Sequence, residues 1–85
     1  MINVKEAYAN ALKHLKELVG DYECDLEEIE LSLDSKLWIV TLSYYEKKPQ
    51  IDSTGLVKVL KKFAKTIRVS SEDGSFFSMK NARIY

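Results

Sequence analysis

The sequence has little cysteine, histidine, proline or glycine, and it has no net charge. One cysteine in 85 residues excludes an internal disulfide, and because small secreted domains are usually cross-linked, we expect a reducing, cytoplasmic location. One histidine and one cysteine cannot supply the usual ligands of a zinc site, and three scattered glycines do not form a phosphate-binding loop. The zero net charge argues against a chain built mainly to hold a polyanion.

Long hydrophobic segments are also missing. The longest apolar run is Leu37–Val40, far shorter than the roughly 20 residues of a membrane-spanning helix. Residues Met1–Glu6 lack the basic start and apolar stretch of a signal peptide. The hydrophobic share of 46% and the charged share of 31% are typical of a globular protein. We therefore expect one domain, residues 1–85, with a modest core and no membrane association.

The start of the chain predicts one amphipathic helix, Asn3–Val19. Asn3 is suited to cap the first turn together with Glu6 three residues later, and Gly20 is suited to the left-handed conformation that ends many helices. Apolar residues recur at steps of three and four and form one stripe. The stripe consists of Val4, Tyr8, Ala11, Leu12, Leu15, Leu18 and Val19.

After the helix, the hydrophobic pattern changes to the alternation of strands. This alternation predicts strands over Leu26–Leu33 and Leu37–Glu46, a third strand from Phe63 onward, and a last strand over Ser75–Ile84. Ser71–Gly74 is typical of a hairpin turn, because an Asp-Gly pair tolerates the positive φ angles that tight turns need.

The middle of the chain separates two pairs of strands. Lys47–Thr54 contains the only proline and predicts a loop that ends at Gly55, whereas Leu56–Leu60 fits either a helical turn or the start of a strand. The order helix-strand-strand-loop-strand-strand predicts an α+β fold, in which one N-terminal helix packs on one face of a four-stranded antiparallel sheet. The order of the strands in the sheet stays open.

Alternation also assigns side chains to the two faces of the sheet. We place Trp38, Val40, Leu42 and Tyr44 in the core, because the alternate set Ile39, Thr41, Ser43 and Tyr45 carries the hydroxyl groups. In the third strand, Phe63, Lys65, Ile67 and Val69 share one face, and in the last strand Phe77 and Met79 point inward. Ile39, Tyr45 and Phe76 are then expected on the uncovered face, where they would form an apolar patch.

Charge is distributed unevenly along the chain. Residues 1–34 carry nine acidic and three basic side chains, whereas residues 35–85 carry ten basic and four acidic ones. The basic cluster suits an acidic partner or RNA, with sheet aromatics as stacking platforms. Alternatively, its lysines protect strand edges or pair across strands with Glu28 and Glu30, which the overall charge balance favours. The cluster consists of Lys47, Lys48, Lys58, Lys61, Lys62, Lys65 and Arg68.

No set of residues predicts catalysis or metal binding. His14 flanks the helical stripe and is expected to pack on the sheet edge, because acid–base work would require an orienting partner. Cys24 lies among acidic residues that raise the pKa of a thiol, the wrong setting for a nucleophile. The acidic run Asp21–Glu30 lacks the spacing of a calcium-binding loop. We therefore expect no enzyme activity, no metal and no cofactor.

Three segments resemble the small PepSY-like domains: Lys5-Glu6-Ala7, Trp38–Leu42, and the hairpin from Ile67 to Lys80 with its Asp73-Gly74 turn. The resemblance implies a cystatin-like fold, with a helix against an antiparallel sheet, and an inhibitory or regulatory binding module without catalytic residues. The chain departs from the family where Ser70 replaces a frequent aspartate and where no export signal precedes the helix.

These patterns lead to two functional hypotheses. The first is a small non-catalytic protein-interaction module, of the inhibitor, immunity or regulatory type or a homodimer, that uses the open sheet face or an edge strand. The alternative is a small nucleic-acid-binding protein that uses the lysine-rich second half and the sheet aromatics. The candidate partner-binding residues are Ile39, Tyr45, Phe76, Lys58, Lys61, Lys62, Lys65 and Arg68.

Overall fold

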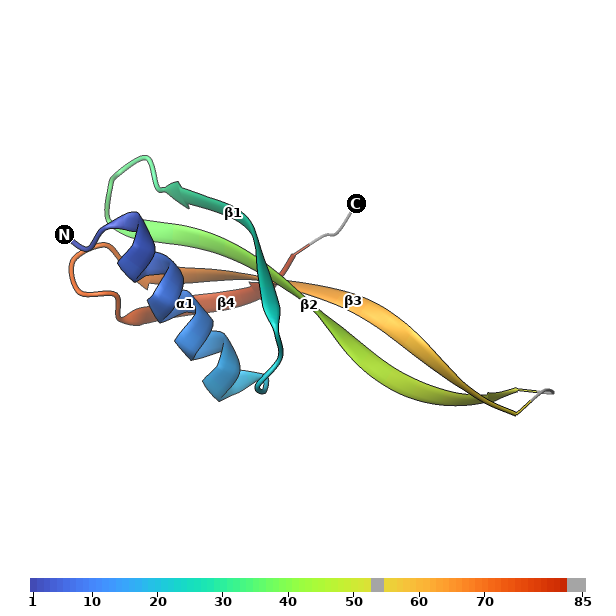
Figure 1. Ribbon diagram of the computed structural model, residues 1–85. Helices are drawn as coiled ribbons and strands as arrows, with labels where there is room; N and C mark the ends of the chain where they lie inside the picture. Colours follow the sequence, from blue (N-terminus) through green and yellow to red (C-terminus); the bar gives the residue numbers. More distant parts are fainter. Residues whose placement is uncertain (53–54, 83–85) are drawn as a thin grey trace.

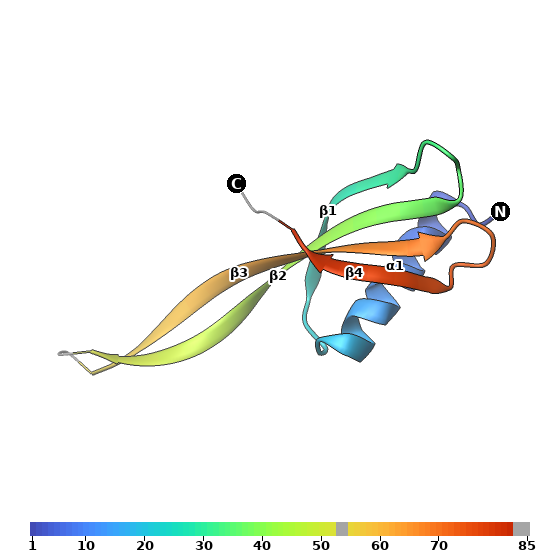
Figure 2. The same cartoon turned by 180° about the vertical axis from the view of Figure 1, so that it is seen from behind.

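A computed structural model describes residues 1–52 and 55–82, except for the side chains of residues 47–60. Helix α1 (Val4–Leu18) is followed by the strands β1 (Cys24–Leu31), β2 (Leu37–Asp52), β3 (Gly55–Ser70) and β4 (Phe76–Asn81). The strands form one antiparallel sheet in the order β1-β2-β3-β4, and α1 covers one face of it (Figure 1). Figure 2 shows the opposite face, which no helix of the described residues covers. The predicted α+β fold is confirmed.

Helix α1 begins and ends where its capping residues indicate. The Asn3 side chain accepts a hydrogen bond of 2.8 Å from the Glu6 amide, and the Glu6 carboxylate accepts one of 3.1 Å from the Asn3 amide. This reciprocal pair satisfies two amides that the first turn leaves without helical partners. Gly20 follows the last turn with a φ of 145°, which favours glycine. Among the described residues, no helix combines the length and hydrophobicity needed to cross a bilayer.

The core lies between α1 and the two central strands. Ala7, Ala11 and Leu15 recur at four-residue steps and are fully buried, and the small alanines allow the helix to approach the sheet closely. The sheet contributes the buried side chains of Val40, Leu42, Tyr44, Ile67 and Val69, with Trp38, Phe63 and Met79 packed around them. The predicted core face of β2 is therefore confirmed, and the face of β3 that carries Ile67 and Val69 lies toward the core.

Strand β1 is displaced from its predicted range. It runs from Cys24 to Leu31, so the predicted inclusion of Leu33 is wrong, and this side chain is fully exposed in the following turn. Polar side chains end the strand: Ser32 Oγ donates to the Asp34 carboxylate at 2.6 Å, and the same carboxylate accepts a bond from the Lys36 amide at 3.0 Å. Ser35, with a φ of 62°, completes the turn.

The predicted loop Lys47–Thr54 is wrong over residues 47–52, while residues 53 and 54 lie outside the described residues. Strands β2 and β3 stay paired from the pair of Leu37 with Ser70 to the pair of Asp52 with Gly55. This pairing also assigns residues 56–60 to a strand. Their distal part, residues 46–52 and 55–61, projects from the helix-covered body as a two-stranded ribbon (Figure 1). We call this ribbon the arm. Pro49 fits here because β1 pairs with β2 only as far as Tyr44, and a strand without a neighbour on one side tolerates proline.

A bulge reverses the predicted facing of two phenylalanines in β4. Arg68 pairs with Ser78 but Val69 pairs with Phe76, so Phe77 is the extra residue. Phe76 therefore lies on the helix side, with its ring centroid 5.4 Å from that of His14, while Phe77 is 64% exposed. The prediction that Phe76 belongs to the uncovered face and Phe77 to the core is wrong, because one extra residue shifts the alternation of a strand. Met79 packs against the core as predicted.

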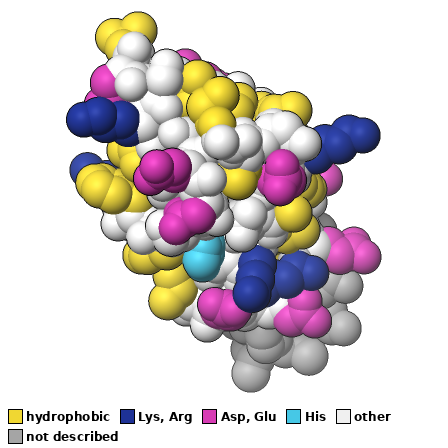
Figure 3. Space-filling view, turned by 90° about the vertical axis from the view of Figure 1, so that its left-hand side faces the viewer, with side chains coloured by type: hydrophobic (Ala, Val, Ile, Leu, Met, Phe, Trp, Pro, Cys, Tyr) yellow, Lys and Arg dark blue, Asp and Glu magenta, His cyan; other side chains and the backbone are white. Residues whose placement is uncertain are grey.

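At the end of the body opposite the arm, the turn before β4 is hydrogen-bonded to the turn before β2: the Ser71 amide donates to the Lys36 carbonyl at 2.9 Å. The predicted hairpin turn is confirmed: Gly74 has a φ of 77°, its amide donates to the Ser70 carbonyl at 2.8 Å, and a Cβ atom there would lie 2.6 Å from the Asn10 side chain. His14 Nε2 lies 3.3 Å from the Gly74 carbonyl oxygen, so this ring packs on the sheet edge as expected. Figure 3 shows this end, where hydrophobic side chains alternate with charges of both signs and the histidine reaches the surface.

Candidate interaction surfaces

The uncovered face of the sheet carries a charge gradient from one edge toward the other. Because residues directly opposite each other share a face, Glu28 lies beside Thr41 and Glu30 beside Ile39, on the side away from the core. The centre of the face carries Ile39, Thr41, Ser43 and Tyr45. The basic side chains come from the other half of the sheet, where Lys62 pairs with Tyr45, Arg68 with Ile39 and Lys80 with Thr66.

Several side chains of this face are bound to one another. Glu27, the extra residue at the bulge of β1, accepts a hydrogen bond of 2.6 Å from Ser43 Oγ and lies 3.3 Å from Lys62 Nζ. The Ser43 hydroxyl first, and then Lys62, hold the pKa of Glu27 below its ordinary value. The Lys62 ammonium also lies 5.8 Å from the centre of the Tyr45 ring. The partner of Lys62 is thus Glu27, whereas the expected partners of the basic cluster were Glu28 and Glu30.

The predicted contact residues do not form one patch. Ile39 is half-buried and Tyr45 is 51% exposed on the uncovered face, as expected, whereas Phe76 is on the helix side. Lys62 and Arg68 share the uncovered face, and Nη1 of Arg68 is buried without a hydrogen-bond partner in the described part of the chain.

The other basic candidates occupy different register positions. By the alternation of the strand, Lys61 and Lys65 lie on the face of β3 opposite to Lys62. The Lys61 ammonium lies 5.4 Å from the Phe63 ring centre, and Lys65 binds the Asn81 side chain. The side chain of Lys58 lies outside the described residues. The alternation of β3 thus divides this lysine-rich segment between the two faces.

An apolar groove between α1 and β1 was not predicted from the sequence. Val4, Lys5, Tyr8, Leu26 and Ile29 line a hollow of about 220 Å³. A second, wider hollow of about 560 Å³ continues along the helix and shares Tyr8 with the first. We call the first hollow the α1–β1 groove, because the lining of the second comes from α1 and Asp21 and includes no residue of β1. The sequence could have indicated this groove, because the apolar stripe of α1 is wider than the part that the sheet buries. Only the row of Ala7, Ala11 and Leu15 is buried, and Val4, Tyr8 and Leu12 lie beside that row.

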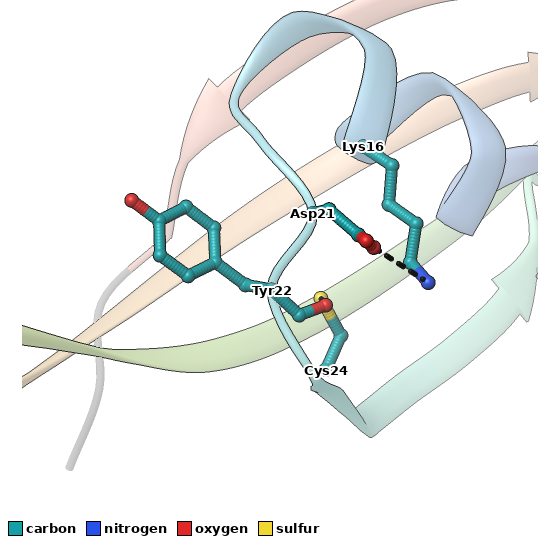
Figure 4. A network of polar contacts seen from close by, with 4 residues as sticks. All are labelled: Lys16, Asp21, Tyr22 and Cys24. Carbon is teal, nitrogen blue, oxygen red and sulfur yellow. Dashed lines mark hydrogen bonds and ion pairs between the residues drawn. The ribbon is translucent and has the colours of Figure 1, made fainter.

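Cys24 opens β1 at the other end of this strand. Its thiol donates a weak bond of 3.4 Å to the Tyr22 carbonyl, close to the ion pair of 3.2 Å between Lys16 and Asp21 (Figure 4). Burial is the main cause that raises the pKa of the Cys24 thiol; Asp25 and Asp21 raise it further, and Lys16 opposes them. The expected direction is confirmed, although burial outweighs the acidic neighbours that the sequence suggested. A protonated, half-buried thiol is poorly suited to nucleophilic attack.

We expect Cys24 to react slowly with iodoacetamide at neutral pH. The raised pKa reduces the thiolate fraction at any pH below it, and the thiolate is the reacting form. The increase of the reaction rate with pH should begin at a higher pH in the folded protein than in the protein unfolded by urea. Mass spectrometry of the modified cysteine measures both rates. Asp25→Asn should increase the neutral-pH rate and Lys16→Met should decrease it. Equal rates in the folded and unfolded protein would contradict this account.

The described residues contain no group of three or more histidine, cysteine, aspartate or glutamate side chains placed to hold a metal ion. In comparisons with protein family models, with curated proteins and with solved structures, nothing matches this chain.

Proposed function

We propose that this chain is a small, non-catalytic protein-interaction module of the cytoplasm, of the inhibitor, immunity or regulatory type, or one that binds a second copy of itself. The observation that carries the proposal is the one-sided cover of the sheet. Helix α1 packs on a single face, and in the described residues the other face and the outer edges of β1 and β4 have no covering element. Open sheet faces and edges are common places for protein partners to bind.

The arm supports the same proposal. A two-stranded ribbon alone in water is only marginally stable, and additional strands or a packed layer are normally needed to stabilise it. In the described part of the chain, no third strand lies beside the distal residue pairs of β2 and β3. These pairs run from Glu46 with Lys61 to Asp52 with Gly55. A bound partner protein would supply that layer.

The resemblance to PepSY-like domains agrees with a regulatory binding module and gives no catalytic residue to consider. Nucleic-acid binding is the less favoured function, because Lys62 is already paired with Glu27 and its basic neighbours lie at register positions of the opposite face. The formal net charge of zero further weakens a phosphate-driven interaction.

Two measurements test the proposal together. Sedimentation velocity over a wide range of concentrations measures self-association, and affinity capture with quantitative mass spectrometry measures a saturable, stoichiometric protein partner. We expect one of the two to give a defined complex. A strict monomer that retains no stoichiometric protein would contradict the proposal. Binding to single-stranded RNA that weakens steadily as salt increases, without any protein complex, would replace it with the nucleic-acid function.

A further inference from the structure

The outer edge of β1 combines an unpaired backbone with an adjoining groove. As the first strand in the order β1-β2-β3-β4, β1 pairs with β2 on one side only, and within the described residues no strand pairs with its other side. The bulge at Glu27 leaves Glu28–Leu31 as a regular paired run. A free edge of this kind can accept one more strand, whose backbone hydrogen bonds supply part of the affinity.

The groove supplies a place for the side chains of such a strand. Val4 is 46% exposed and Leu26 is 43% exposed, although both belong to the apolar lining of the α1–β1 groove. Side chains of a strand alternate between its two faces. A strand added to β1 would therefore direct every second side chain toward the groove and α1, and burying apolar groups there is favourable.

The side chains of β1 on the uncovered face indicate which charge the added strand should carry. Asp25, Glu28 and Glu30 are exposed on the uncovered face, and none of the three has an ion-pair partner among the described residues. Glu27 differs, because Ser43 and Lys62 already bind it. Unpaired carboxylates along one strand repel a second copy of β1 and attract basic side chains.

We propose that β1 and the α1–β1 groove bind an extended, basic segment of a partner protein by strand addition. Apolar residues of the segment occupy the groove at alternate positions, and lysines or arginines between them lie over Glu28 and Glu30. The added strand pairs with Glu28–Leu31, because the bulge at Glu27 interrupts the regular edge. This inference rests on the proposed function and names the surface and the chemistry of its partner.

The probe is a synthetic peptide in which lysine and valine alternate, titrated into the labelled full chain and followed by amide chemical shifts in NMR. We expect shifts confined to β1 and to the residues of α1 near Val4 and Tyr8, with affinity that decreases as salt increases. The matched peptide with glutamate in place of lysine should not bind. N-methylation of the amides along one edge of the lysine peptide should abolish binding, whereas N-methylation along the opposite edge should not, because an added strand pairs through one edge.

A pair of charge reversals tests the protein side. Glu28→Lys should weaken binding of the peptide about fivefold, because an attraction is replaced by a repulsion. Glu72→Lys, an exposed glutamate in the turn before β4, makes the same change in net charge away from the edge and should leave affinity unchanged. Thermal unfolding of both variants controls for folding.

Any one of four outcomes would overturn the inference. Equal effects of both N-methylated peptides, or equal effects of both charge reversals, would show nonspecific attraction to an acidic surface. Shifts on the uncovered face around Tyr45 would place the peptide elsewhere. A dimer in which the amides of β1 are protected from exchange would assign the edge to a second copy. The last two outcomes overturn strand addition of a basic partner while leaving the interaction module intact.

Discussion

Replacing Leu15 with alanine is expected to lower the free energy of unfolding by about 3 kcal/mol. Leu15 is fully buried in the contact between α1 and the sheet, as the last residue of the row with Ala7 and Ala11. Removing its side chain loses apolar burial and leaves a cavity that the small neighbouring alanines cannot fill. Chemical denaturation followed by far-ultraviolet circular dichroism measures the loss. In a domain of 85 residues, a change of this size is a large part of the total stability.

Leu18→Ala is the matched control for this prediction. It makes the same chemical change in the last turn of the same helix, but Leu18 is 62% exposed. We expect its cost to stay within about 0.5 kcal/mol, as for substitutions away from the core. Similar losses in the two variants would mean that α1 does not pack on the sheet through the row that ends in Leu15.

Replacing Tyr44 with alanine is expected to cost about 3–5 kcal/mol, the usual range for a buried aromatic residue. The Tyr44 ring is buried and stacks between two others, with centroid distances of 4.8 Å to Tyr22 and 5.7 Å to Phe63. This stack joins the segment before β1 to the parts of β2 and β3 that lie next to the arm. Its loss should therefore reduce the near-ultraviolet circular dichroism signal as well as the stability.

The neighbouring residue provides the control. Tyr45→Ala removes the same group from the opposite face of β2, where the ring is half-exposed and its polar contact is with Lys62. We expect a cost below about 1 kcal/mol, since an exposed cation–ring contact is weak. If Tyr45→Ala were the more damaging change, the register of β2 would be shifted by one residue, because such a shift exchanges the two faces.

The elements that were predicted well depend on short-range patterns. The Asn3–Glu6 capping pair is confirmed, and Ala11 and Leu15 of the predicted stripe are buried, because caps and the helical period act within a few residues. The stripe left out the buried Ala7 and included Val4 and Leu18, which are exposed. The alternation of Val40, Leu42 and Tyr44 assigned the core face of β2 correctly. Patterns of this kind need no knowledge of the partner element.

The errors lie where one extra residue or a distant partner decides the outcome. Bulges at Glu27 and Phe77 change the facing of their strands, and their positions depend on the register with β2 and β3. For this reason Phe76 was assigned to the wrong face. The polar contact between Glu27 and Lys62 likewise depends on residues far apart in the chain.

By itself, the sequence determined the fold class, the single helix with its caps and the core face of β2, because periodicity and capping act within a few residues. Only the tertiary structure decided the strand order, the continuation of β2 and β3 into the arm, and the division of the basic residues between two faces. Each of these depends on which backbone groups pair across the sheet, and that choice is made by contacts between distant segments, beyond the reach of local patterns.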